Sequence, residues 1–317
     1  DVDGTTSVAM MYSFLKKYNK NIEYYIPCRY DEGYGISLKG IDYAAKNNYS
    51  LIIALDCGIR AVDQINYANE KGIDFIICDH HTPAEKTPNA IAILNPKQID
   101  CNYPFKELSG CGVGFKLIQA YCINNNIAFE EIEPLLDLVV VSIAADIVPM
   151  IGENRILAFY GLKQINSNPR IGLKALMRAS SKTKDITISD VVFGIAPRIN
   201  SAGRIDHAKK SVEILIEEDY EKAKSFANAI EENNIIRKNL DKSITIEALE
   251  MIDKNKKSTV VFSEKWHKGV VGIVASRLIE KYYKPTIVLA EKNGMLTGSA
   301  RSVHGFDLYQ AISKCSH

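Results

Sequence analysis

The sequence lacks the features of several common classes of protein. Its seven cysteines form no Cys-x-x-Cys pair and have no regular spacing, which argues against a structural zinc site and against a disulfide framework. Because no signal peptide is visible, we expect reduced thiols and a cytoplasmic protein. No apolar run approaches the roughly 20 residues that a membrane-spanning helix needs, so no membrane partner is expected.

Excess charge of one sign is also lacking. The net charge is +1, so no global basic field indicates nucleic acid, and any binding groove must come from local clusters of Arg and Lys. There is no internal repeat, no low-complexity segment and no evident Ser-His-Asp or Cys-His nucleophile set. What remains is an ordinary globular composition, 46% hydrophobic and 24% charged, over 317 residues, a length that predicts two domains.

Two short apolar runs end in acidic residues. Residues 51–58 read Leu-Ile-Ile-Ala-Leu-Asp-Cys-Gly, and residues 73–81 read Ile-Asp-Phe-Ile-Ile-Cys-Asp-His-His. Such runs are typical of buried strands in a parallel sheet. Ligands of an open α/β sheet bind beyond the carboxyl ends of its strands, which is where Asp56, Asp79, His80 and His81 are expected to meet.

The chain opens on Asp1-Val2-Asp3-Gly4, a third acidic group. We expect a strand before Asp1, and therefore a longer parent protein. A single acid at a strand end is usually a helix cap or a turn residue. Several carboxylates in one crevice would instead repel each other unless cations lay among them. Oxygen and imidazole ligands suit Mn²⁺ or Mg²⁺, so a metal crevice is the favoured interpretation.

Alternating strands and helices predict a parallel sheet in the first part of the chain. The expected helices are 5–18, capped by Thr5-Thr6-Ser7, then 37–48, 60–71 and a helix that follows the glycines of 110–114, and the further strands are 22–27 and 90–94. Residues 135–147 are apolar almost all round, which predicts a buried helix that delivers Asp146 to the crevice. An Asp there would be costly without a partner, which supports a ligand role.

The pattern in the second half of the sequence predicts more helices and then a second α/β segment. Residues 154–180 read as two helices separated at Pro169, and residues 219–253 contain no Pro or Gly and read as one long helix. Strands at 258–263, 285–290 and 295–302 and a helix at 266–282 follow. The predicted domains are therefore 1–217 and 255–317, with 218–254 as the connecting helix.

The acidic motifs together resemble a known family. Asp-x-Asp-Gly, the strand-end Asp-Cys-Gly, Asp-His-His and Asp146 in Val-Ser-Ile-Ala-Ala-Asp-Ile-Val-Pro have the order of the four motifs of the DHH phosphoesterase superfamily. Within it, the chain most resembles the RecJ-like single-stranded-DNA exonucleases, over essentially all of its length. Trp266-His267-x-Gly and Gly298-Ser-Ala-Arg301-Ser302 are similar to a DHHA1 domain. The family continues into a Gly-Gly-His segment, so a C-terminally incomplete DHHA1 domain is expected.

The resemblance implies a fold and a function. The implied fold is α/β, a parallel-sheet DHH domain and a smaller α/β DHHA1 domain joined by a long helix, with the active site in the cleft between them. The implied function is metal-dependent 5′–3′ exonucleolytic hydrolysis of single-stranded DNA in repair and recombination. A helicase or a single-strand-binding protein is a candidate partner.

The resemblance also implies roles for the motif residues. Two ions, Mn²⁺ or Mg²⁺, are expected, with Asp56 bridging them, Asp1 favouring one ion, and Asp3, His80 and Asp146 favouring the other. His81 would touch the scissile phosphate, and Asp79 would orient an imidazole. The candidate catalytic residues are Asp1, Asp3, Asp56, Asp79, His80, His81 and Asp146.

Substrate contacts are expected outside the acidic motifs. Arginine forks match phosphate oxygens and aromatic rings stack on bases. The candidates, taken from segments similar to those of the family, are Arg29, Tyr34, Arg198, Asn200, Arg204, His267, Arg301 and Ser302, with His207 a weaker one. The bland alternatives are a surface turn for 28–35, a turn between helices with solvated arginines for 196–204, and a packed interdomain corner for Trp266 and His267.

Two other functions remain open. One is a DHH/DHHA1 nano-RNase or cyclic-dinucleotide phosphodiesterase, against which the segment 198–204 and the long helix argue. The other is a non-catalytic DNA-binding scaffold of the same fold, against which the retention of every motif acid and both histidines argues.

Overall fold

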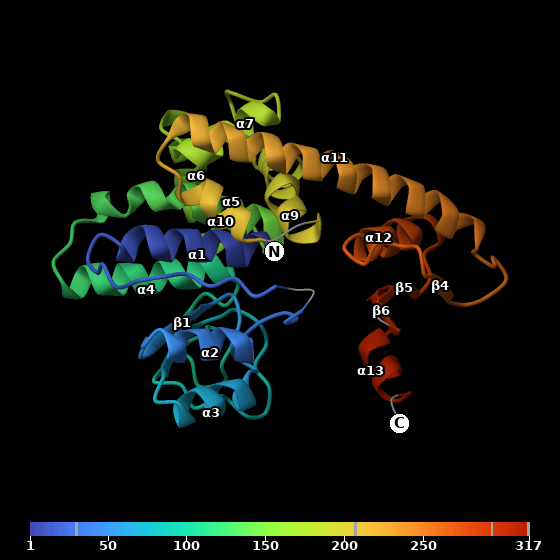
Figure 1. Ribbon diagram of the computed structural model, residues 1–317, viewed down its shortest axis with the longest axis horizontal. Helices are drawn as coiled ribbons and strands as arrows, with labels where there is room; N and C mark the ends of the chain where they lie inside the picture. Colours follow the sequence, from blue (N-terminus) through green and yellow to red (C-terminus); the bar gives the residue numbers. More distant parts are fainter. Residues whose placement is uncertain (29–30, 206–207, 293, 316–317) are drawn as a thin grey trace. The chain divides into compact units, whose positions relative to one another are not determined.

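The computed structural model describes residues 1–28, 31–205, 208–292 and 294–315 (Figure 1). The chain forms two compact units, Asp1–Glu231 and Glu232–His317. The first contains α1 (Val2–Leu15), α2 (Leu38–Lys46), β1 (Leu51–Leu55), α3 (Val62–Glu70), β2 (Asp74–Cys78), β3 (Ala92–Leu94), α4 (Gly110–Asn124), η1 (Phe129–Glu131), η2 (Glu133–Leu135), α5 (Leu136–Asp146), α6 (Gly152–Ser167), α7 (Ile171–Ala179), α8 (Ile188–Asp190), η3 (Val191–Ile195), α9 (Ala196–Ile205) and α10 (Lys209–Ile216).

The sheet of the first unit is parallel throughout, in the order β1-β2-β3. Its register pairs Leu55 with Cys78 and Cys78 with Leu94, so the three strands end level with one another. Asp56 and Asp79 are the residues that follow β1 and β2. The predicted parallel strands are confirmed, and their register brings the two acids to the same edge.

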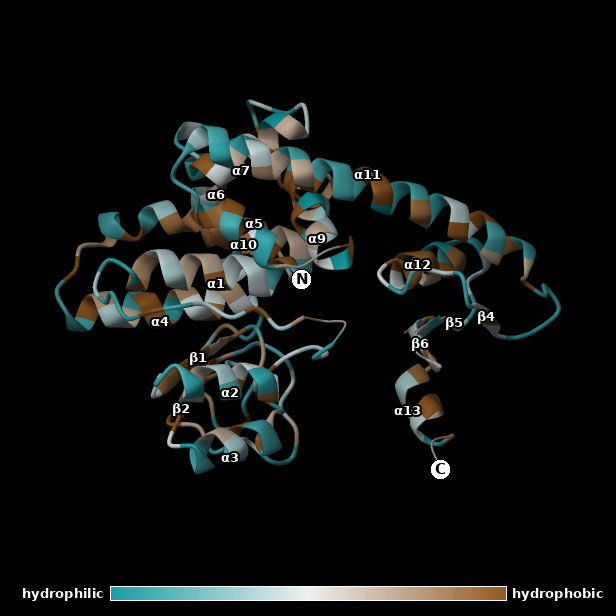
Figure 2. Cartoon of the chain, viewed as in Figure 1, coloured by the Kyte–Doolittle hydropathy of each residue, from teal (hydrophilic) through white to brown (hydrophobic). Residues whose placement is uncertain are grey.

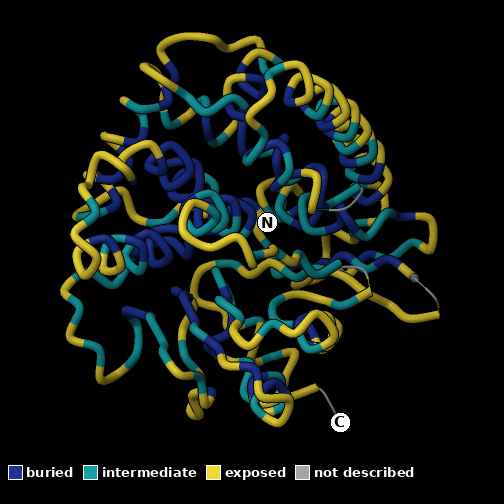
Figure 3. The backbone as a smooth tube through the Cα atoms, turned by 60° about the vertical axis from the view of Figure 1, so that its left-hand side comes forward, coloured by how far each residue is buried: buried dark blue, intermediate teal, exposed yellow. Residues whose placement is uncertain are grey.

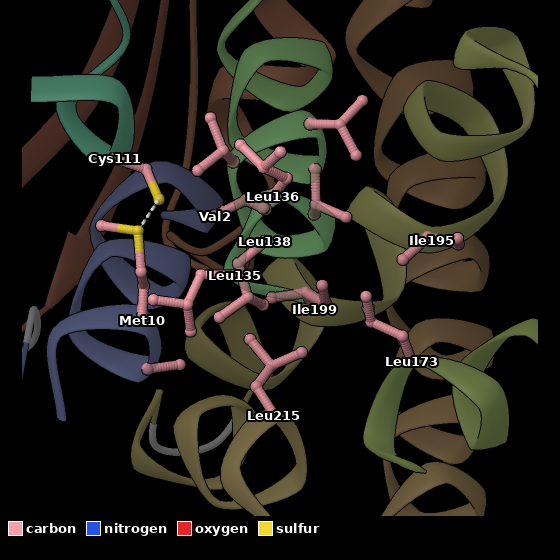
Figure 4. Close-up of a cluster of buried hydrophobic side chains, with 14 of the residues drawn as sticks. Val2, Met10, Cys111, Leu135, Leu136, Leu138, Leu173, Ile195, Ile199 and Leu215 are labelled. Atoms are coloured by element: carbon pink, nitrogen blue, oxygen red, sulfur yellow. Dashed lines mark hydrogen bonds between the residues drawn. The ribbon is translucent and has the colours of Figure 1, made fainter. Parts of the chain in front are cut away.

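Helices α1, α4 and α5 form the interior of the first unit, beside the sheet. Their facing side chains include Met10, Phe115 and Leu138, each fully buried. Figure 4 shows this cluster, where the Cys111 thiol donates to Met10 Sδ over 3.6 Å. A second cluster, with Ile41, Ile65 and Phe75, lies between the sheet and helices α2 and α3. In Figure 3 the buried backbone concentrates in such interior elements, and the loops are mostly exposed.

Helix α11 (Tyr220–Glu250) begins in the first unit and continues into the second. It matches the long helix predicted over 219–253, and Figure 2 shows a largely hydrophilic helix with separate apolar positions. Two of these, Ile244 and Ala248, are buried among the core of the second unit. Asp241, on the same helix, accepts a hydrogen bond from Arg277 over 2.5 Å and is buried.

The second unit contains β4 (Thr259–Ser263), α12 (Val271–Tyr282), β5 (Thr286–Lys292), β6 (Met295–Arg301) and α13 (Leu308–Ser313). β4 and β5 are parallel, whereas β5 and β6 are antiparallel. Trp266, Val274 and Val288 lie in its core. The predicted helix begins at Val271 rather than at Trp266, and the predicted strands are confirmed. Among the described residues, none of the helices combines the length and apolarity that crossing a bilayer requires.

Two predictions for the N-terminal part are wrong. The strand expected at 22–27 is absent: residues 22–28 are extended but form no ladder with β1, which pairs only with β2 among the described residues. Helix α1 starts at Val2 with Asp1 as its N-cap, whose carboxylate accepts from the Gly4 N–H over 2.9 Å. Thr5-Thr6-Ser7 therefore lie inside the helix, where their hydroxyls donate to carbonyls one turn earlier.

Two other segments are helical, although the sequence suggested a glycine-rich turn for one and a turn between helices as an alternative for the other. The glycines of 110–114 form the first turns of α4, because Ser109 caps that helix by accepting from Gly112 N. Residues 196–204 lie in α9, which continues a helical run through the π-helical turn η3, so the alternative of a turn between helices is wrong.

Close packing of α5 against α6 depends on Gly161. A Cβ added there would lie 2.5 Å from the Leu136 carbonyl oxygen and 2.7 Å from Val140 Cβ. We predict that Gly161→Ala lowers the free energy of unfolding by about 1–3 kcal/mol, because overpacking outweighs the better helix propensity of alanine. Denaturant titration measures this. In the control Gly194→Ala, the new Cβ would meet Ser180 only at 3.9 Å, so equal losses in both variants would contradict the prediction.

Candidate metal centre

Four acidic and imidazole side chains converge beside the sheet edge. Asp56 follows β1, His80 follows β2, Asp3 lies in the first turn of α1, and Asp146 is the last residue of α5. His80 Nε2 lies 3.2 Å from Asp56 Oδ1, 3.6 Å from Asp146 Oδ2 and 3.7 Å from Asp3 Oδ2. Elements far apart in the sequence therefore supply one cluster of side chains.

Asp56 is held in an unusual position. Its φ of 59° is left-handed, and its N–H donates to the Cys78 carbonyl over 2.8 Å. Gly110 makes room for it, because a Cβ at Gly110 would lie 2.5 Å from Asp56 Oδ1. The side chain is buried, and Oδ1 has no hydrogen-bond partner among the described residues. Burial, and then the charge of Asp3, raise the pKa of Asp56 to about 9.

Asp3 is buried but well supplied with donors. Its carboxylate accepts from the backbone N–H groups of Gly110 and Cys111 and from the Ser142 hydroxyl, each over 2.7 Å. The first turn of α4 thus presents its free N–H groups to a carboxylate, as helix N-termini do to anions. Our sequence analysis missed Ser142, and its place one turn before Asp146 on α5 was the available signal.

Asp79 has a different role from Asp56. Its carboxylate accepts from the N–H groups of Ile59, His80 and His81 and contacts His81 Nδ1 at 2.7 Å. Burial acts to raise the pKa of Asp79, but the hydrogen bonds from the His81 ring and the backbone outweigh it, so the pKa is lowered. Both oxygens are occupied by the protein, so Asp79 fixes the backbone and the His81 ring.

His81 is the exposed member of the group, with 58% of its side chain accessible. The hydrogen bond to Asp79 raises the pKa of His81, with burial acting in the opposite direction. A ring held on one side by a carboxylate and open on the other can donate to an oxygen of a bound phosphate.

The donor set fits hard or borderline divalent cations. Ligand atoms of Asp3, His80 and Asp146 lie within 4.8 Å of one another, and so do those of Asp56, His80 and His81. Burial, and then Asp3, raise the pKa of Asp146. Asp1 is exposed at the edge of this region. Its carboxylate and that of Asp56 both lie beside Gly4, because a Cβ added at Gly4 would be 3.4 Å from Asp1 Oδ1 and 3.4 Å from Asp56 Oδ2. Several carboxylates beside an imidazole, with few protein groups donating to them, form a set of ligands that suits Mn²⁺ or Mg²⁺.

A cavity of about 1350 Å³ adjoins the cluster in the first unit. Asp1, Asp56, Asp79 and His81 line one part of it. Its other walls are mostly apolar and come from α1, β1, α2 and the extended residues 22–28. The acids thus border a hollow on their open side.

The structure places the substrate candidates in different settings. Arg198 is buried, where it pairs with Glu231 at 2.5 Å and donates to the carbonyls of Gly194 and Ala179. We expected a phosphate contact at this position, but its contacts instead fix α9. Asn200 and Arg204, on the same helix, are partly exposed. Arg29 and His207 lie outside the described residues.

The remaining candidates lie on the surface. Tyr34 is 76% exposed, in the surface turn that was the bland alternative for its segment. In the second unit, His267 is partly buried and Nδ1 accepts from Gly269 N. Arg301 is exposed and donates to the hydroxyls of Ser276 and Ser299. Ser302 is exposed and donates to the Phe306 carbonyl. Their roles toward a substrate stay predictions.

Comparison with protein families gives a match in each of the two units. Residues 1–143 match the DHH family, N-terminal domain, and residues 254–317 match the DHHA1 domain. The first part of the chain is thus similar to the DHH family, and its last part to the DHHA1 domain. The motif acids and histidines up to His81 lie within the first match, and Arg301 lies within the second.

The chain is similar to curated RecJ proteins. It is 40% identical to the single-stranded-DNA-specific exonuclease RecJ of Bacillus subtilis, over 99% of this chain and 40% of that protein. It is 35% identical to RecJ of Escherichia coli, over 99% of this chain and 58% of that protein. The chain thus spans about half the length of these relatives.

Solved structures give the same result for the fold. The crystal structure of exonuclease RecJ bound to manganese superposes with a TM-score of 0.88 at 29% identity, over 99% of this chain and 78% of that one. RecJ from Thermus thermophilus in complex with Mn²⁺ gives a TM-score of 0.88 at 27% identity, over 99% of this chain and 45% of that one. The predicted α/β fold with a parallel sheet is confirmed.

The raised pKa of Asp56 predicts how the metal-free protein responds to pH. The folded protein binds this proton more tightly than the unfolded chain, whose aspartates have a pKa near 4, so stability is lost as pH rises from about 4 to about 9. In chelator, we expect wild-type stability to fall between about pH 6 and about pH 9 by up to about 1 kcal/mol per pH unit. Asp56→Asn should reduce this slope, and Asp146 and His81, whose pKa values are also raised, account for the remainder.

Urea unfolding of both proteins at each pH measures the slope. The control is Asp63→Asn, an exposed aspartate in the first turn of α3, which should keep the wild-type slope. An unchanged slope in Asp56→Asn would contradict the argument.

Proposed function

We propose that this chain is the catalytic core of a metal-dependent exonuclease that hydrolyses single-stranded DNA from its 5′ end. The observation that carries the proposal is the cluster around His80, where three carboxylate oxygens lie within 3.2–3.7 Å of one nitrogen and Asp56 Oδ1 has no protein donor among the described residues. Its similarity to RecJ, over nearly the whole chain, supports DNA as the substrate.

The residues present suit two cations of the kind named for the RecJ structures, Mn²⁺ or Mg²⁺. Asp1, Asp3, Asp56, His80 and Asp146 would hold them, with Asp56 as the bridge. When bound, the cations supply an activated water and neutralise charge that develops on the phosphate. Asp56 suits the bridge because it is a buried carboxylate in the cluster with an oxygen that no donor of the described residues occupies.

The protein's own groups then orient the substrate. His81, held by Asp79, donates a hydrogen bond to an oxygen of the scissile phosphate, and its raised pKa favours the protonated ring more than in a free histidine. The α4 N-terminus and Ser142 hold the Asp3 carboxylate in place by donating hydrogen bonds to it. Arg204, Arg301 and Ser302 are proposed backbone contacts, with Arg29, Tyr34, Asn200 and His267 as further candidates.

The wider setting is part of the same proposal. The domains are proposed as 1–217 and 255–317, joined by the helix 218–254. The parent protein would act in DNA repair and recombination in the cytoplasm, with a helicase or single-strand-binding protein as partner. The polarity rests on the resemblance to RecJ-like enzymes.

The decisive assay uses long single strands labelled at either end, with Mn²⁺ or with chelator. A 5′–3′ exonuclease releases labelled mononucleotide from the 5′-labelled strand at once and shortens the 3′-labelled strand progressively. Release should require the metal. Preference for a dinucleotide over the long strand would favour the nano-RNase alternative, and binding without cleavage would favour the scaffold.

The bridging role of Asp56 predicts how metal rescues variants. Asp56→Ala removes a ligand from both ions, whereas His80→Ala weakens one. We expect Asp56→Ala to remain folded, because removing one acid relieves repulsion, and to stay inactive at every Mn²⁺ concentration. His80→Ala should partly recover as Mn²⁺ is raised. Equal rescue of the two variants in a Mn²⁺ titration would overturn the bridging assignment.

A further inference from the structure

The exposed side of α6 is unusual for a surface helix. Asn154, Leu157, Ala158, Gly161 and Ile165 face the protein interior. The opposite stripe, named here the α6 outer face, consists of Arg155, Ile156, Phe159, Tyr160 and Lys163. Ile156 is 58% exposed and Phe159 65%, although a surface helix ordinarily turns polar residues to solvent. The Phe159 and Tyr160 rings touch edge to face, with centroids 5.2 Å apart.

The charges on this face are of one sign. Arg155 and Lys163 flank the apolar residues, and neither side chain takes part in an ion pair or hydrogen bond among the described residues. The nearest acid in sequence, Glu153, is already neutralised by Lys116 at 2.5 Å and accepts from Tyr103. The face therefore presents free cations interleaved with apolar and aromatic surface.

The face is continuous in sequence with the candidate metal centre. Asp146 is followed by Ile147, which is 79% exposed and has a φ of 57°, a left-handed conformation that costs a β-branched residue energy. Met150 and Ile151 are also exposed. Sites of such strain often serve ligands, and here it turns an isoleucine outward directly after a proposed metal ligand.

The packing of α5 against α6 fixes the direction of the face. α6 begins six residues after α5 ends, and Gly161 lies against Leu136 and Val140 near the start of α5, so the two helices are antiparallel and side by side. The outer face thus starts near Asp146 and runs away from it. At 1.5 Å per residue, Phe159 lies roughly 10 Å along the helix from Gly152.

We propose that the α6 outer face, together with Ile147, is a track on which single-stranded DNA lies as it leads to the metal centre. Bases stack on Phe159 and Tyr160, and Arg155 and Lys163 contact phosphates, a combination that suits sequence-independent binding of a single strand. The inference rests on the proposed function. It adds a substrate surface on α6 that contains none of the candidate site residues named from the sequence.

Two double variants test the track, Phe159→Ala with Tyr160→Ala and Arg155→Glu with Lys163→Glu. All four residues are exposed, so folding should be retained, as thermal unfolding would verify. We expect affinity for a labelled single strand of about 20 nucleotides, measured by anisotropy in chelator, to fall about fivefold or more in each. The ratio of kcat/KM on that strand to kcat/KM on a dinucleotide should fall similarly.

The matched controls are Phe129→Ala and Lys20→Glu, exposed residues beyond the far ends of α4 and α1. Both should keep the wild-type affinity and ratio. Unchanged affinity in the two track variants would overturn the proposal. So would loss of self-association in sedimentation without loss of DNA affinity, which would make the face a protein interface. A wild-type chain that binds the strand but cleaves nothing would refute the proposed function alone, because the anisotropy measurement would still test the track.

Discussion

Mutual repulsion among buried carboxylates is the constraint on which the candidate site depends. Asp3, Asp56 and Asp146 surround one imidazole, and burying like charges together is costly unless each charge is compensated. The protein compensates only some of them. Asp3 has the α4 N-terminus and Ser142, and Asp79 has three backbone N–H groups and His81. Asp56 Oδ1 has no such donor among the described residues, and burial, followed by the charge of Asp3, raises the pKa of this carboxyl. The cluster therefore suits a metal better than a structural ion-pair network.

The surrounding fold holds Asp56 in this environment with strained backbone conformations. Asp56 and Ile147 are both left-handed, and each adjoins or belongs to the cluster. Gly110 serves two acids at once, because its missing side chain leaves space for Asp56 while its N–H donates to Asp3. The level ends of β1 and β2, the start of α4 and the end of α5 therefore have to meet within a few ångströms. No single one of these elements would create the site.

The sequence was sufficient where a local pattern determines the outcome. Apolar runs followed by Asp56 and Asp79 predicted parallel strands and their common edge, and the all-round apolar run 135–147 predicted the buried helix that carries Asp146. The sequence was not sufficient where the structure of a segment depends on contacts with residues far away in the chain. Residues 22–27 read as a strand, but a strand requires a hydrogen-bonded neighbour, and β1 pairs only with β2 among the described residues. Likewise, the backbone donors of Asp3 at Gly110 and Cys111 come from a helix more than a hundred residues away, which no spacing reveals.

Residue type and resemblance to a family segment also failed to predict the setting of Arg198. Arg198 and Arg204 lie on the same helix six residues apart, and both were expected at phosphates because an arginine fork fits them. Arg198 instead lies in the interior, where Glu231 and two carbonyls use its donors. Arg155, in no segment that resembles a motif, is exposed beside Ile156 and Phe159. In a chain with a net charge of +1, the cations available to a nucleic acid are those that the fold leaves without acidic partners. Burial and ion pairing in the folded protein determine which arginines and lysines are available, and the position of a residue within a motif does not reveal either.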